Sequence, residues 1–235
     1  EKLKISNVDP VAYELYLKAK DMKSNNVPMM ETKIELFLES INIDSSYSES
    51  WAELATACVN VAQATKKGQY YINLSKYAVR KAISLNSESL SSILAGTQLY
   101  SETGDVEKST ELSIKAMRLS GGKSGHAELG YNLRYAGLMN ESMDLYQISS
   151  KLDESGTGRA NFLIQSGKSN IYLGEIDKAI SITRQGVGLA KNNNITAPVW
   201  LIYEGVPYLY SKMPEKAFPY FDFVSDIDPS NTWSI

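Results

Sequence analysis

Small residues recur along this chain at nearly constant intervals, and a valine takes the last place in the series. Ala82 and Ala116 lie 34 residues apart, and Ser149 follows 33 residues later. The next intervals are 37 residues, to Gly186, and 38 residues, to Val224. A period of about 20 to 50 residues is typical of a chain built from repeated units, each of which contacts its neighbours. The sequence therefore predicts a stack of similar units and not a fold around one central core.

A second series, made of glycines, has the same period. Gly104, Gly137 and Gly174 are separated by 33 and 37 residues. Glycine is common just after a helix end, where the backbone adopts a positive φ angle. Two kinds of landmark thus repeat in phase, which favours helix pairs of about 34 residues joined by short turns.

The local patterns inside the units are helical. Asp9 followed by Pro10 is a typical helix start, with an N-cap residue and a proline in the first turn. The next helix is predicted to bury a stripe of apolar residues at helical spacing. This stripe consists of Ile34, Phe37, Leu38 and Ile41.

The segment 198–229 shows the repeated pattern most completely. Its order and spacing resemble the tetratricopeptide pattern W-x2-L-G-x2-Y…A-x3-F…P. A small residue on each of two crossing helices lets the backbones approach, and the aromatic residues fill the groove beside the crossing. The landmark residues are Gly205, Tyr208, Ala217, Phe221 and Pro229.

The resemblance to tetratricopeptide repeats implies an all-α fold, a right-handed α-solenoid of antiparallel helix pairs. We expect residues 1–9 to be a lead-in or linker and residues 10–235 to form a single repeat domain of about six helix pairs. The pattern is weakest in the first unit, where Lys33 stands at a position expected to hold a small residue. Members of this family bind peptides or protein surfaces on their concave face.

Composition narrows the class of partner. The 235 residues include 24 Lys and Arg against 27 Asp and Glu, which gives a net charge of −3 and no basic stripe for phosphates. No apolar run approaches the ~20 residues of a membrane span. We therefore expect a protein or peptide partner, with a small-molecule effector as a further class. Direct contact with nucleic acid and a membrane span are not expected in this segment, and the compartment, bacterial cytoplasm or periplasm, stays open.

The residues available for catalysis are few. Cys58 is the only cysteine, and its apolar helical face predicts a buried, inert thiol. His126 is the only histidine, and its place near a helix start predicts a surface or capping residue. Without a second histidine or a thiolate partner, no Ser-His-Asp or Cys-His arrangement can be assembled. The glycine-rich segment 120–126 does not satisfy the phosphate-loop pattern and is predicted to be a turn. No cofactor, metal or catalytic residue is expected.

In this family the first helix of each pair faces the concave groove. The chain is rich in tyrosine, with 15 against 5 phenylalanines, and tyrosine offers a large contact area with few torsions to fix. The alternative is that several of these tyrosines pack against neighbouring helices. Counting from the pattern, the predicted partner-binding residues are Tyr131, Arg134, Tyr135, Asn161, Gln165, Lys168, Tyr172, Tyr203 and Tyr210.

Chaperone-binding members of the family hold a peptide C-terminal carboxylate with lysine and asparagine at fixed positions of two adjacent units. Here Ala52 and Thr56 occupy these positions in one unit, and Leu94 and Gln98 in the next. The carboxylate clamp is therefore absent, and a co-chaperone function is disfavoured.

The expected function is that of a non-catalytic protein-interaction scaffold. The segments 7–22 and 43–55 also look like the repeat region of bacterial, CadC-like winged-helix transcriptional regulators and of some nucleotide cyclases. That resemblance implies a sensory or regulatory domain of a larger protein. The alternative is a hydrolase with a carboxylate site in the groove, in which an aromatic environment would raise the pKa of Glu204.

Overall fold

The computed structural model describes residues 8–22, 26–153, 157–192, 199–227 and 229. These residues form α-helices and one short 3-10 helix, and no strand occurs among them. Most of the predicted lead-in, residues 1–7, and the last residues, 230–235, lie outside the described part. The helices are α1 (Pro10–Asp21), α2 (Val27–Ile43), α3 (Ser48–Ala64), α4 (Gly68–Leu85), α5 (Leu90–Glu102), α6 (Val106–Leu119), α7 (His126–Tyr135), α8 (Met139–Leu152), α9 (Thr157–Tyr172), α10 (Ile176–Asn192), α11 (Val199–Leu209), the 3-10 helix η1 (Pro214–Ala217) and α12 (Phe218–Ile227).

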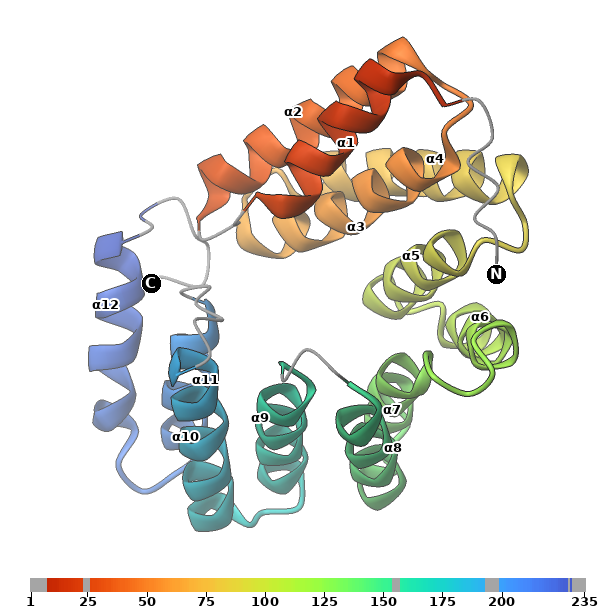
Figure 1. Ribbon diagram of the computed structural model, residues 1–235. Coiled ribbons are helices and arrows are strands. Elements are labelled where there is room, and N and C mark those ends of the chain that lie inside the picture. Colours follow the sequence, from red (N-terminus) through yellow and green to blue (C-terminus); the bar gives the residue numbers. More distant parts are fainter. Residues whose placement is uncertain (1–7, 23–25, 154–156, 193–198, 228, 230–235) are drawn as a thin grey trace.

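Consecutive helices pack against one another along the whole series. The most extensive contacts join α3 with α4 and α9 with α10, and each further pair also contacts the next one. Figure 1 shows the helices following one another around a curve, from α1 and α2 to α12. The predicted all-α solenoid of helix pairs is therefore confirmed. No helix in the described part of the chain is both long enough and apolar enough to cross a membrane.

A buried serine joins the two helices of a pair in the first four pairs. In each, the hydroxyl of a fully buried serine on the second helix donates a hydrogen bond to a backbone carbonyl oxygen of the first helix. Such a bond satisfies the hydroxyl and holds the two backbones close together. The bonds run from Ser40 to Ala12 (2.7 Å), from Ser75 to Ala55 (2.9 Å), from Ser109 to Thr97 (3.0 Å) and from Ser142 to Gly130 (2.6 Å).

These serines correct the expectation for the first unit. Lys33 was predicted to stand where a small residue belongs, but the small residue at the crossing of α1 and α2 is Ser40, which is fully buried. The first pair therefore follows the same rule as its neighbours. In α10 and η1 the corresponding places are taken by Ala179 and Ala217, which are also fully buried.

The last pair has the close crossing that the pattern predicts. A Cβ atom added to Gly205 would lie 3.3 Å from the carbonyl oxygen of Ala217 and 3.0 Å from the Cβ of Tyr220. Tyr208 is buried as predicted, and its ring stacks on that of Tyr220, with ring centres 6.1 Å apart. Helix α12 ends at Ile227, two positions before Pro229, which cannot continue a helix.

The predicted turns are confirmed. Gly104, Gly137 and Gly174 have φ angles of 80°, 85° and 77°, in the region that L-residues with a side chain rarely adopt. The segment 120–125 is a turn between α6 and α7, also with positive φ angles.

The observed burial agrees with the prediction for Cys58 and differs from it for His126 and Leu38. Cys58 is fully buried, and desolvation raises the pKa of its thiol to about 12, so the thiol is inert as predicted. His126 was expected at the surface but is buried at the first turn of α7. Leu38 was expected on the buried stripe of α2 but is exposed, and Leu36 is buried in its stead.

Candidate binding cavity

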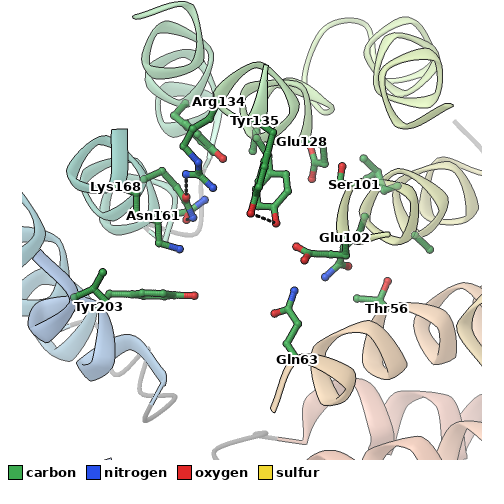
Figure 2. Close-up of a pocket in the computed structure, with 18 of the residues that line it drawn as sticks. Thr56, Gln63, Ser101, Glu102, Glu128, Arg134, Tyr135, Asn161, Lys168 and Tyr203 are labelled. Carbon is green, nitrogen blue, oxygen red and sulfur yellow. Dashed lines mark hydrogen bonds between the residues drawn. The ribbon is translucent and has the colours of Figure 1, made fainter. Parts of the chain in front are cut away.

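The inner side of the curve holds a cavity of about 900 Å³. Its wall is built mainly by α3, α5, α7, α9 and α11, the first helices of their pairs, with Tyr146 added from α8. Figure 2 shows the side chains of these helices pointing toward a common centre. The volume falls in the range of about 300 to 1,000 Å³ that is typical of ligand pockets.

All nine residues predicted to bind a partner lie in the wall of this cavity. Their position follows from the helical period, because residues three or four apart on one helix share a face. Their role in binding remains a prediction. They are Tyr131, Arg134 and Tyr135 of α7, Asn161, Gln165, Lys168 and Tyr172 of α9, Tyr203 of α11, and Tyr210 directly after α11.

Three of the tyrosines are largely accessible. Tyr135, Tyr172 and Tyr210 are exposed by 65%, 64% and 62%, so these rings are not packed against neighbouring helices. Tyr131 is half-buried, and its hydroxyl donates a hydrogen bond to the hydroxyl of Tyr135 at 3.2 Å. The two rings lie 4.8 Å apart, which fixes the position of the exposed Tyr135 ring.

Arg134 lies deep in the wall, with only 5% of its surface exposed. Its Nη1 donates a hydrogen bond to Oε1 of Gln165, and Nε2 of Gln165 in turn donates to Oδ1 of Asn161 at 3.2 Å. The guanidinium carbon lies 5.1 Å from the ring centre of Tyr131 and 5.7 Å from that of Tyr135. Cation–π contacts and one amide thus hold the guanidinium in place, and no described carboxylate forms a salt bridge with it.

Lys168 is the second cation of the wall. Its Nζ lies 3.7 Å from the centre of the Tyr203 ring. Burial, together with the positive charge of Arg134, lowers the pKa of this amine to about 7, and the carboxylate of Glu102 opposes the shift. Among the described residues, Lys168 has no salt-bridge partner.

Three carboxylates that the sequence analysis did not single out also line the cavity. Glu53 lies 3.7 Å from Nζ of Lys20, whereas Glu102 and Glu128 form no salt bridge in the described part of the chain. Burial raises the pKa of Glu128. Figure 2 shows Glu102 and Glu128 on one side of Tyr135, with Lys168 on the other. The position of Glu128 could have been predicted from the sequence, because it precedes Tyr131 by three residues and so shares its helical face.

The positions of the absent carboxylate clamp also face the cavity. Ala52 and Thr56 of α3 and Leu94 and Gln98 of α5 are all in its wall. These four positions therefore hold uncharged side chains where the clamp has lysine and asparagine.

Glu204, the residue proposed for a hydrolase site, does not line the cavity. Its carboxylate lies 3.5 Å from Nε of Arg184 and 3.7 Å from Nζ of Lys191, and the hydroxyl of Tyr220 donates to it at 3.3 Å. These contacts tie α11 to α10 and α12. The expectation of a groove carboxylate at this position is therefore wrong, because the side chain faces the other helices of the stack.

Comparison with known proteins identifies the fold. No family model matches the sequence, and no curated protein matches it. Among solved structures, a tetratricopeptide protein of Thermus thermophilus, TTC0263, has 11% sequence identity and a TM-score of 0.60, covering 81% of this chain and 97% of its own. PilW, a type IV pilus biogenesis factor, has 10% identity and a TM-score of 0.60, covering 96% and 97%.

A third similar structure is that of the human IFIT1 dimer with m7Gppp-AAAA. It shares 14% identity with this chain at a TM-score of 0.65, and the match covers 89% of this chain but 48% of IFIT1. At such identities the likeness concerns the fold alone. The chain thus has the fold of tetratricopeptide-repeat proteins.

Proposed function

We propose that the chain is a non-catalytic scaffold that binds a peptide or a protein surface in its cavity. The observation that carries the proposal is the presence of three exposed tyrosines in the cavity wall. Tyr135 and Tyr172 lie at the ends of α7 and α9, and Tyr210 directly follows α11. Tyrosine is enriched among residues that dominate protein interfaces, because a large rigid ring loses little freedom on binding.

The wall of the cavity is held in place before any partner binds. The hydrogen bond between Tyr131 and Tyr135 and the contacts from Arg134 to Gln165 fix side chains from α7 and α9. A preformed surface lowers the cost of ordering on binding.

Selection from a random peptide library displayed on phage provides the test. Removing two of the exposed rings, in the variant Tyr135→Ala with Tyr172→Ala, is expected to weaken binding of the selected peptides at least about tenfold, because each ring contributes buried contact area. Since both rings are more than half exposed, helical content and melting temperature should stay unchanged.

Tyr70→Ala is the matched control. Tyr70 is 62% exposed on α4 and does not line the cavity, so this variant should bind the peptides as the parent protein does. Equal loss of binding in the control would place the binding surface elsewhere. Unfolding of the double variant would instead assign these rings to the core.

We propose further that the scaffold is the sensory or regulatory domain of a larger protein, such as a bacterial transcriptional regulator. The resemblance of residues 7–22 and 43–55 to the repeat region of CadC-like regulators supports this role. The complete gene product is then expected to contain a DNA-binding region or another effector domain as well. A complete translation with neither would contradict the regulatory role and leave the scaffold function standing.

A further inference from the structure

We propose that the cavity takes a peptide segment carrying both kinds of charge. An acidic group of the peptide lies between Arg134 and Lys168, and a basic group faces Glu102 and Glu128. This inference names the ligand class of the cavity and therefore rests on the scaffold function proposed above.

The cationic half of the cavity lacks an anion. Arg134 is 5% exposed and uses Nη1 for its bond to Gln165, which leaves further N–H donors of the guanidinium for a ligand. The ammonium group of Lys168 has the Tyr203 ring on one side, at 3.7 Å, and no carboxylate partner among the described residues. A buried cation without an anion is costly, and a carboxylate from a ligand would offset that cost.

The acidic half lacks a cation. Glu128 of α7 and Glu102 of α5 line the same cavity, and neither forms a salt bridge within the described residues. Desolvation already disfavours the charged form of Glu128. An ammonium or guanidinium group of a ligand would stabilise both carboxylates.

The two halves belong to one site. Glu102 acts electrostatically on Lys168, and so does Arg134, although the three residues come from three different helices. The carboxylates disfavour a polyanion such as a nucleic acid, since its phosphates would lie against Glu102 and Glu128. The net charge of −3 gives such a ligand no compensating attraction. Charge complementarity thus favours a ligand that carries both signs.

The site predicts a dependence of affinity on pH. Several ionisable groups share the cavity wall with Lys168. They are Glu53 of α3, Glu102 of α5, Glu128, Tyr131, Arg134 and Tyr135 of α7, Tyr146 of α8, Tyr172 of α9, Tyr203 of α11, and Tyr210. No residue of α10 lines the cavity.

The pKa of Lys168 is about 7 in the empty cavity, and a bound carboxylate raises it. Binding is therefore strongest below pH 7, where the amine is already charged. It weakens above pH 7, by at most about tenfold per pH unit.

Four pools of fluorescently labelled hexapeptides, acetylated and amidated at their ends, test the proposal by anisotropy. One pool contains Glu and Lys, one Glu and Gln, one Lys and Gln, and one Gln alone, each with Tyr and Ala in the remaining places. The Glu–Lys pool is expected to bind about tenfold more tightly than the others at pH 6.5, and to lose about tenfold in affinity by pH 8.5. An oligothymidylate of matched length is expected to bind more weakly than that pool.

Variants of the intact chain assign the effect to residues. Lys168→Arg keeps a cation at every pH of the titration, so it should bind the Glu–Lys pool with a flat pH profile. Glu128→Gln is nearly isosteric and should remove the advantage of the Glu–Lys pool over the Glu–Gln pool. Arg134→Gln should weaken both pools that contain glutamate, and its circular dichroism shows whether it has folded.

Each outcome separates the two proposals. Equal binding of all four pools, abolished by Tyr135→Ala with Tyr172→Ala, would overturn the mixed-charge ligand and support the scaffold. Tighter binding of the Glu–Gln pool or of the oligothymidylate would likewise overturn the mixed-charge ligand. Peptide binding that is insensitive to the two tyrosines would overturn both proposals. An unchanged pH profile in Lys168→Arg would remove Lys168 from the site.

Discussion

Replacing Gly125 with alanine is expected to lower the free energy of unfolding by about 2 to 4 kcal/mol. Gly125 is the N-cap of α7 and has a φ angle of 96°, a conformation that costs a residue with a side chain about 1 to 2 kcal/mol. The added Cβ would also lie 2.6 Å from the carbonyl oxygen of Ser113 and 2.9 Å from Cγ of Met117. Because the first of these contacts is with backbone, the neighbour cannot turn aside and α7 must shift.

Gly122 provides the matched control in the same turn. Its φ angle is 83°, but a Cβ added there would have no atom within 4 Å. Gly122→Ala should therefore cost only the conformational part, about 1 to 2 kcal/mol. Urea denaturation followed by circular dichroism measures both variants. Equal losses would show that the contact with α6 contributes nothing, and no loss in either would contradict the strained turn.

Gly125→Ala also has a functional consequence, because α7 carries much of the cavity wall. Arg134, Tyr131 and Tyr135 all lie on this helix, and Arg134 reaches Gln165 on α9. A shift of α7 would displace these side chains together. If the scaffold proposal is right, Gly125→Ala should weaken peptide binding under conditions in which most of the protein is still folded, whereas Gly122→Ala should not.

The architecture could be predicted from sequence because its determinants are local and repeated. A turn with a positive φ angle needs a glycine such as Gly104, and a close helix crossing needs a small residue such as Ala179 or Ala217. Both requirements are visible as residue types at fixed intervals. The residues that face the cavity could be predicted from the helical period, because it places residues such as Tyr131 and Tyr135 on one face of the helix.

The properties of the site that depend on three-dimensional neighbours were not predictable. The spacing of Lys168 indicates the groove, but its pKa is lowered by burial and by the charge of Arg134 on another helix. Glu204 also lies on an inner helix, but its carboxylate pairs with Arg184 and Lys191 of α10 and so faces away from the cavity. Likewise, the sequence pattern does not show that Ser40 can occupy a buried helix crossing. Its hydroxyl needs a hydrogen-bond acceptor there, and the carbonyl oxygen on the facing helix provides it.

Replacing Ser142 with valine is expected to lower the free energy of unfolding by about 2 to 4 kcal/mol, as overpacking and a lost hydrogen bond combine. Ser142 is fully buried on α8, and its hydroxyl lies only 2.6 Å from the carbonyl oxygen of Gly130 on α7. Carbon atoms prefer separations of about 3.5 to 4.0 Å, so a methyl group cannot take the place of the hydroxyl. The helices would have to move apart.

Ser142→Ala separates the two contributions. It removes the hydrogen bond without adding volume, and we expect a loss of about 1 kcal/mol. Ala179 occupies the corresponding place on α10 beside Gly167, which shows that the fold accepts alanine there. The urea midpoints of the two variants give the comparison, provided that both have the same denaturant slope. If valine proved no worse than alanine at this position, the close approach of α7 and α8 would not limit the size of the residue there. The small buried residues at the other helix crossings, such as Ser40 and Ala179, would then need another explanation.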